Sequence, residues 1–194
     1  MLYRPNRRAL LATLGAAVAA PAVAALSMKA GGGSTVSTGS TGSTGSTAKK
    51  PDSLDWQPLD WPKKKWREVL SDDAYRVLFQ EGTERPFSSP LNDEKRDGLF
   101  LCAACFLPLF DAETKYDSGT GWPSFYAPIE GRLGTSRDFK LLVPRTEYHC
   151  ARCGGHQGHV FDDGPAPTGK RYCNNGVALR FVAAGEELPA LRGA

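Results

Sequence analysis

The five cysteines of this 194-residue chain divide into two pairs and one single residue. Cys102 and Cys105 form one Cys-x-x-Cys pair, and Cys150 and Cys153 form a second. Each such turn points two sulfurs at one place, so two turns can supply the four thiolates that hold Zn²⁺ in a tetrahedron. Cys173 lies outside this set, and its thiol is therefore free to act as a nucleophile.

A zinc ion bound by four cysteines has no open coordination position, so the expected cofactor, one Zn²⁺ per chain, is structural. The 44 residues between Cys105 and Cys150 exceed the spacing of a compact zinc ribbon, and the metal would clip two distant hairpins together. Two alternatives stay open. The pairs could form disulfides in an exported protein, although disulfides in so tight a loop are generally redox-active. His149 could replace a cysteine as ligand.

Polar side chains surround Cys173 in the sequence. Arg171, two residues before it, would share its strand face and favour the reactive thiolate. Asn175, two residues after it, could donate a hydrogen bond to a bound oxygen. His156 and His159 could deliver protons near neutral pH. These residue types together are what nucleophilic catalysis by a thiol requires.

The segment from Gly119 to Phe125 would present Trp122 and Phe125 as a rigid aromatic pair on a loop. Each candidate also has an ordinary structural interpretation. The two aromatic side chains could be part of the core, the histidines could be satisfied within a turn, and Cys173 could be a buried, inert thiol. Residue types alone leave catalysis and these structural roles open.

The elements that must position these residues are mostly strands. From Gly98 onward, short apolar segments alternate with turn residues, which is typical of antiparallel strands. The expected strands are Leu99–Leu101, Leu107–Phe110, Phe139–Val143, Val160–Phe161 and Val177–Val182. One helix is expected after Ser71 as its N-cap, with Gly82 closing it. The predicted fold class is mainly β, with one or two short peripheral helices.

The first 53 residues differ from the rest of the chain. In residues 1–30, three arginines precede an apolar run and a small-residue cleavage site, as in an export signal. A pair of adjacent arginines suggests the twin-arginine route, and an uncleaved membrane anchor is the alternative. Residues 31–53 form a Gly/Ser/Thr-rich linker. Residues 54–194 form one domain, which would work in the bacterial periplasm or cell envelope.

The charge of the domain argues against nucleic-acid binding. The whole chain carries a formal net charge of +3, and the first 50 residues contain six basic and no acidic residues. Residues 51–194 therefore carry −3. A mildly acidic domain lacks the basic surface that binding to phosphate backbones requires.

From about Lys64 to Phe181 the chain resembles the B-type methionine sulfoxide reductases, the peptide-methionine (R)-S-oxide reductases. The shared motifs, in the family's order, are Gly82-Thr83-Glu84-x-Pro86-Phe87, Cys102-x-x-Cys105, Lys115-Tyr116-Asp117-Ser118-Gly119-x-Gly121-Trp122-Pro123-Ser124-Phe125, Cys150-x-x-Cys153, His156-x-Gly158-His159-Val160-Phe161, Asp163-Gly164-Pro165-x-Pro167-Thr168-Gly169 and Arg171-Tyr172-Cys173-x-Asn175. The resemblance implies two antiparallel β-sheets with short helices, and a structural zinc bound by four cysteines, remote from catalysis.

The resemblance also implies a mechanism. Cys173 would attack the sulfoxide sulfur while His156 or His159 assists protonation of the oxygen, and release of methionine would leave Cys173 as sulfenic acid. Trp122 would hold the ε-methyl group and reject the other epimer. The remaining implied site residues are Phe125 for substrate binding, and Asn175 and Arg171 for orienting and activating the thiolate.

The chain departs from the family at two places. Thr120 stands where many members have a cysteine that resolves the sulfenic acid, and the other cysteines are assigned to zinc. We therefore predict a one-cysteine cycle in which a thioredoxin-like protein or a small thiol reduces Cys173. In addition, Gly176 and Ala178 replace two serines of the usual Asn-Ser-Ala-Ser-Leu, which removes hydroxyls near Cys173.

The expected substrates are oxidised proteins or peptides containing methionine-(R)-sulfoxide, and the expected state is a monomer. Two other classes of protein compete with this interpretation. A zinc-ribbon-like module for binding a protein partner would account for four cysteines, but not for Cys173 and its neighbours. A thiol–disulfide oxidoreductase could use one Cys-x-x-Cys pair, but only if zinc does not occupy it.

Overall fold

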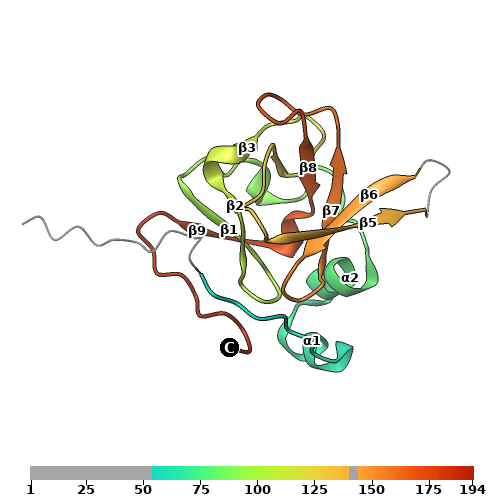
Figure 1. Cartoon of the computed structure of the whole chain (residues 1–194), viewed down its shortest axis with the longest axis vertical. Coiled ribbons are helices and arrows are strands. Elements are labelled where there is room, and N and C mark those ends of the chain that lie inside the picture. Colours follow the sequence, from blue (N-terminus) through green and yellow to red (C-terminus); the bar gives the residue numbers. More distant parts are fainter. Residues whose placement is uncertain (1–53, 140–143) are drawn as a thin grey trace, which may run out of the picture. The chain divides into compact units, whose positions relative to one another are not determined.

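The computed structural model describes residues 54–139 and 144–194. The predicted export signal and the whole of the predicted linker lie outside this range. The described residues form a mainly β structure with two antiparallel sheets and two short α-helices (Figure 1), which confirms the predicted fold class. Within the described ranges, no helix has both the length and the apolar character needed to cross a membrane.

The two sheets have three and six strands. The smaller has the order β2-β1-β9, made of Pro108–Asp111, Gly98–Cys102 and Leu179–Ala183. The larger has the order β3-β4-β8-β7-β6-β5, made of Lys115–Tyr116, Ser124–Phe125, Arg171–Asn174, His156–Phe161, Arg145–Cys150 and Leu133–Asp138. Strands that are distant in the sequence are therefore neighbours, and β8 lies between β4 and β7.

Aromatic side chains join the two sheets. Phe110 of β2 stacks on Phe125 of β4 with 4.1 Å between ring centroids, and Phe100 of β1 meets Phe125 edge-on at 4.9 Å. Tyr148 of β6 and Tyr172 of β8 complete this cluster, with 5.4 Å between their rings. Such offset and edge-on pairs add to the stabilisation from apolar burial. This aromatic cluster packs one face of the six-stranded sheet against the three-stranded sheet.

Helix α1 (Lys63–Val69) and helix α2 (Asp72–Gln80) precede the sheets. The Ser71 side chain accepts a hydrogen bond from the amide of Ala74 at 3.3 Å, which confirms the predicted N-cap. The expected C-terminal residue was wrong by one position. Glu81, rather than Gly82, takes the left-handed conformation that ends α2, with φ of 53°.

The strand predictions were partly correct. Strands β1 and β7 contain two of the predicted segments, and β2 begins one residue later than the predicted segment Leu107–Phe110. The last one begins later than expected, because Gly176–Ala178 forms the 3₁₀-helix η4 and β9 starts at Leu179. Of the predicted strand Phe139–Val143, residues 140–143 lie outside the described part, and Phe139 follows the end of β5. Two further 3₁₀-helices are η2 (Pro90–Asn92) and η3 (Ala112–Thr114).

Candidate active site and metal centre

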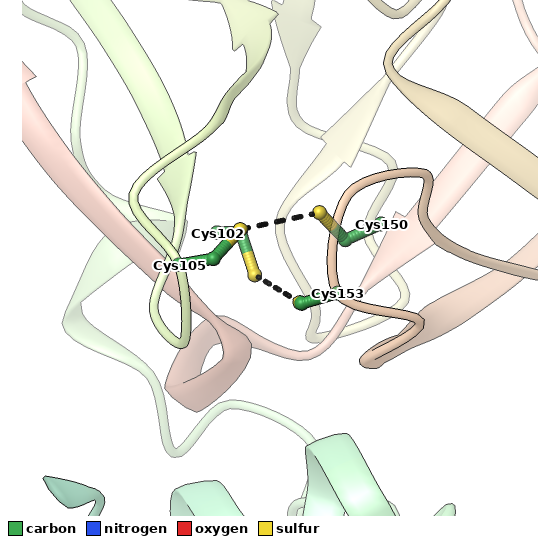
Figure 2. A group of neighbouring side chains, drawn as sticks. All are labelled: Cys102, Cys105, Cys150 and Cys153. Atoms are coloured by element: carbon green, nitrogen blue, oxygen red, sulfur yellow. Dashed lines mark hydrogen bonds between the residues drawn. The ribbon is translucent and has the colours of Figure 1, made fainter. Parts of the chain in front are cut away.

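The four paired cysteines converge as a group that could hold a metal ion (Figure 2). Their sulfur atoms all lie within 4.8 Å of one another. The sulfurs of Cys102 and Cys153 are 3.7 Å apart, and those of Cys105 and Cys150 are 3.5 Å apart. A tetrahedral zinc ion with Zn–S bonds of ~2.3 Å separates its sulfurs by ~3.8 Å. The donor set and its geometry therefore fit zinc.

The surroundings of this group decide between the alternatives. All five cysteines are free, so neither Cys-x-x-Cys pair forms a disulfide. The ring nitrogen Nδ1 of His149 lies 3.2 Å from Glu147 Oε2, so His149 faces a carboxylate and not the sulfurs. Fully buried Gln157 donates a hydrogen bond to Cys102 Sγ at 3.4 Å. The group that could hold a metal ion is thus made of the four cysteines, and Gln157 on β7 donates a hydrogen bond to one of their sulfurs.

The fifth cysteine, Cys173, lies on β8 at a separate site. Its register partners are Ser124 on β4 and His159 on β7. A cavity of about 120 Å³ opens at this place. Its walls are formed by Thr83, Trp122, Arg145, Gly158, His159, Phe161, Cys173, Asn174 and Asn175. A thiol, an imidazole and two aromatic rings therefore meet at one small, mostly apolar cavity.

The two histidines of β7 are each held by a carboxylate from the neighbouring hairpin. His159 Nε2 lies 2.7 Å from Asp138 Oδ2, and Arg145 Nη2 lies 2.6 Å from the same oxygen. His156 Nδ1 lies 2.9 Å from Glu147 Oε1, and His156 is only 3% exposed. The two rings meet edge to face at 5.5 Å. His159 lines the cavity and His156 lies buried beside it, so the structure separates two histidines that the sequence treated alike.

Their carboxylate partners affect the site electrostatics. Burial lowers the pKa of His159 below its usual value, and nearby Arg145 adds to this effect against the opposing hydrogen bond with Asp138. For Glu147, burial opposes ionisation, but hydrogen bonds with His149, His156 and Ser136 hold its pKa below the usual value. At neutral pH the imidazole at the cavity is therefore largely uncharged, while the carboxylate behind His156 is ionised.

Cys173 itself has a raised pKa. Burial is the main cause, whereas Arg171 and a hydrogen bond from Thr120 act in the lowering direction. Arg171 is in turn held by Asp163, with Nε to Oδ1 and Nη2 to Oδ2 both at 2.9 Å, and its guanidinium lies 4.3 Å from the Phe161 ring centre. The predicted thiolate-favouring effect of Arg171 has the expected sign, but burial outweighs it in the free protein.

This balance gives a pH prediction. Because the thiolate is the form that reacts with iodoacetamide, the alkylation rate of Cys173 should keep rising above pH ~8.5, the ordinary cysteine pKa. Replacing Arg171 by Met removes a cation that lowers the pKa, so the profile should move further to alkaline pH. Rates are measured by mass spectrometry of the Cys173 peptide. A plateau near neutral pH would contradict the prediction.

The other predicted site residues have clear positions. Trp122 lines the cavity, and its Nε1 donates a hydrogen bond to the Glu84 carbonyl at 3.2 Å. The Asn175 side chain accepts from the Glu84 amide at 3.0 Å and donates to the Gln157 carbonyl at 2.9 Å. Phe125 is fully buried in the aromatic cluster between the sheets, so it packs in the core behind the cavity.

Several residues at the site were not anticipated from the sequence. They are Asp138 and Glu147 as partners of the histidines, and Thr83, Arg145, Gly158 and Phe161 in the cavity wall. Gly158 pairs with Asn174 across β7 and β8, and a Cβ on Gly158 would overlap the Cys173 carbonyl oxygen. The sequence signal for Asp138 and Glu147 was the presence of acidic residues in two polar segments. Their contact with the histidines depends on the register of β5, β6 and β7, which the sequence does not show.

Comparison with known proteins agrees with this geometry. The SelR domain model matches residues 70–183. A "Peptide methionine sulfoxide reductase MsrB" of Pseudomonas putida strain GB-1 is 57% identical over 115 residues, covering 59% of this chain and 88% of that protein. A protein of the same name from Methanosarcina barkeri is 52% identical over 120 residues, covering 61% of this chain and 84% of that protein.

The matched region contains the cysteine group, the β7 histidines, the Trp122 loop and Cys173. The resemblance drawn from the motifs is thereby confirmed over most of the described domain. From the cavity, the metal centre and these relatives together, the chain belongs to the SelR domain family, the family of the B-type methionine sulfoxide reductases.

Proposed function

We propose that this protein is a peptide-methionine (R)-S-oxide reductase that acts on oxidised proteins and peptides, with Cys173 as its nucleophile. The observation that carries the proposal is the cavity that Cys173 and His159 line together with the rings of Trp122 and Phe161. The cavity is small and mostly apolar, which suits a thioether methyl group, and its few polar groups lie beside the thiol. Relatives that share 50–57% identity carry the corresponding enzyme name.

The protonation states at the site suggest how the reaction begins. Burial keeps Cys173 as a thiol and His159 as a neutral imidazole, so one proton is held on sulfur and the imidazole can accept it. As the thiol attacks the sulfoxide sulfur, this proton passes by way of His159 to the sulfoxide oxygen. The protonated oxygen then moves to the Cys173 sulfur, while its bond to the substrate sulfur and the transient bond between the two sulfurs break. Cys173 becomes sulfenic acid, oxidised by two electrons, and the substrate leaves as methionine, reduced by the same two electrons.

The carboxylates assign different tasks to the two histidines. Because Nε2 of His159 is engaged by Asp138, its other ring nitrogen, Nδ1, is the one that exchanges the proton. His156, buried and bonded to Glu147, supports the ring of His159 from behind. Arg171 and Asn175 orient the strand end that carries Cys173.

We also propose that the four-cysteine group binds one structural Zn²⁺. The sulfur spacing fits tetrahedral zinc, and the closed ligand set leaves no position for substrate. Cys102 ends β1 in the small sheet and Cys150 ends β6 in the large sheet, so the metal would tie the two sheets together. A metal-bound set of cysteines is unavailable for disulfide exchange, which argues against the thiol–disulfide oxidoreductase.

The activity is tested with the separated R and S epimers of dabsylated methionine sulfoxide, using the full chain and dithiothreitol. The expected result is consumption of the R epimer only, because a rigid wall formed by Trp122 and Phe161 accepts the methyl group in one orientation. Equal consumption of both epimers, or none by a folded and metal-loaded protein, would refute the proposal. The zinc-ribbon-like binding module would then be the better description.

The position of Thr120 supports the proposed one-cysteine cycle, because its hydroxyl hydrogen-bonds Cys173 and also lies 2.8 Å from Ser118 Oγ. With no reductant, one turnover should leave Cys173 as sulfenic acid, trapped by dimedone and found by mass spectrometry. An intramolecular disulfide at Cys173 would contradict the prediction. As a matched control, Thr120→Cys places a thiol where the hydroxyl now contacts Cys173, and should yield a disulfide in the same experiment.

We propose that the protein is a monomer, and that a thioredoxin-like protein or small thiol regenerates Cys173. We further propose export to the periplasm or cell envelope, supported by the arginines, apolar run and cleavage site of residues 1–30. Fractionation of a bacterium that produces the full chain should place it outside the cytoplasm. Replacing Arg7 and Arg8 together by Lys should retain it inside if it uses the twin-arginine route.

A further inference from the structure

Glu84 has an unusual position among the residues around Cys173. It belongs to the segment between α2 and η2, it is only 7% exposed, and the adjacent Thr83 lines the cavity. A carboxylate that is withdrawn from water must be stabilised by hydrogen bonds or by opposite charge. The structure shows these bonds, and all of them lead to the segments that build the site.

The Glu84 carboxylate binds the backbone that follows Cys173. Its Oε1 accepts a hydrogen bond from the Gly176 amide, and its Oε2 accepts one from the Val177 amide at 3.1 Å. These two amides open η4, the turn that leads from β8 into β9. Each oxygen of the Glu84 carboxylate therefore accepts one backbone hydrogen bond from this segment. The turn that begins three residues after Cys173 is therefore held from outside the sheet.

The main chain of Glu84 makes two more such bonds. Its amide donates to Asn175 Oδ1 at 3.0 Å, and its carbonyl accepts from Trp122 Nε1 at 3.2 Å. One residue thus contacts the aromatic wall of the cavity, the asparagine beside the nucleophile and the turn behind it. Direct hydrogen bonds of Glu84 thus connect all three groups.

Ser89 completes this arrangement. It is 8% exposed, and its side chain occupies the space into which a Cβ on Gly176 would project. The same Cβ would lie 3.2 Å from Glu84 Oε1. Gly176 is one of the two positions where the chain departs from the family's usual serines. The Ser89 side chain fills the space that a side chain at position 176 would occupy. The segment that carries Glu84 and Ser89 therefore fits closely against the turn that begins at Gly176.

We infer that Glu84 is a positioning residue for Cys173, which acts with the Ser89–Gly176 contact to hold Trp122, Asn175 and the turn after the nucleophile in their reactive arrangement. A role of Glu84 in catalysis presupposes the reductase activity proposed above. Glu84 does not touch the reacting atoms. It acts through the three groups that it binds.

The first test is Glu84→Gln in the full chain. The amide keeps the shape, but its NH₂ group cannot accept the second backbone N–H, so the turn should shift. We expect kcat/KM for the R epimer to fall by about 10- to 100-fold at a temperature where the variant is fully folded, since small misplacements have effects of this size. Glu68→Gln, on the exposed surface of α1, is the matched control and should retain wild-type kinetics.

The second test uses the paired contact. Gly176→Ala should lower kcat/KM because its methyl group overlaps Ser89, and Ser89→Gly combined with Gly176→Ala should restore most of the activity. A purely structural role of Glu84 would lower the unfolding temperature and leave the kinetics of the folded protein unchanged, which would overturn the inference. So would wild-type activity in Gly176→Ala, or no rescue in the double variant. If Glu84→Gln does not fold, the inference is judged by the activities of Gly176→Ala and of the double variant Ser89→Gly with Gly176→Ala.

The alkylation rate of Cys173 separates this inference from the proposed function. If wild-type protein reduces neither epimer, the proposed function fails, and the inference is then judged by iodoacetamide alone. A displaced turn should change the alkylation rate at pH 8 in Glu84→Gln but not in Glu68→Gln. An unchanged rate in both variants would overturn the positioning role.

Discussion

Cys173→Ser should abolish reduction of the R epimer, with kcat/KM lower by at least about 10³-fold. A serine hydroxyl is far less acidic than a thiol and cannot take the sulfoxide oxygen to form a sulfenic acid. The remaining groups of the cavity, His159 and Trp122 among them, bind and orient substrate but have no sulfur to oxidise. Turnover is measured with the dabsylated substrate and dithiothreitol.

The loss must come from the missing sulfur and not from unfolding. Cys173 is partly exposed at the cavity and lies outside the metal group, so the serine should change the free energy of unfolding by less than about 1 kcal/mol. The variant should keep the wild-type unfolding temperature and bound metal. Residual turnover near the wild-type level in such a folded variant would show that another group is the nucleophile.

Removal of the metal should unfold the domain. Structural zinc contributes on the order of 10 kcal/mol to folding, which is comparable to the whole stability of a small domain, about 5–15 kcal/mol. Cys102 and Cys150 end strands in different sheets, so the link between the sheets is lost with the metal. Cys150→Ser should therefore lose the cooperative thermal transition seen by circular dichroism.

Cys173→Ser serves as the matched control for this prediction, because it removes a thiol outside the metal group. Zinc released on denaturation, measured with a chromogenic chelator, should be one per chain for wild type and Cys173→Ser. Cys150→Ser should release much less. A Cys150→Ser protein with the wild-type unfolding temperature would show that the four-cysteine group does not stabilise the fold through a metal.

Much of the site could be predicted because its signals are local. A Cys-x-x-Cys turn brings its own two sulfurs together, so two such turns define a ligand set before the fold is known. The N-cap at Ser71 depends on an amide three residues away. Cys173 could be inferred as the candidate nucleophile because the other four cysteines were assigned to the metal group.

Other parts depend on long-range pairing, which no local pattern contains. Adjacent residues of a strand face opposite sides of the sheet, so Ser124 and Phe125 could exchange roles with a register shift of one. The register places Ser124 opposite Cys173, and Phe125 opposite Tyr172. Phe125 therefore packs with Phe110 in the core, although the sequence suggested contact with substrate.

The sequence by itself determined the chemical groups: four thiolates for a metal, a fifth thiol, two histidines and an aromatic loop. Only the tertiary structure decided which histidine reaches the cavity, because the β5–β6 hairpin places Asp138 against His159 and Glu147 against His156. It also brought Glu84 to amides about ninety residues later in the chain. The physical reason is that turns and caps arise within a few residues, whereas electrostatics and packing at a site arise from segments that only folding brings together.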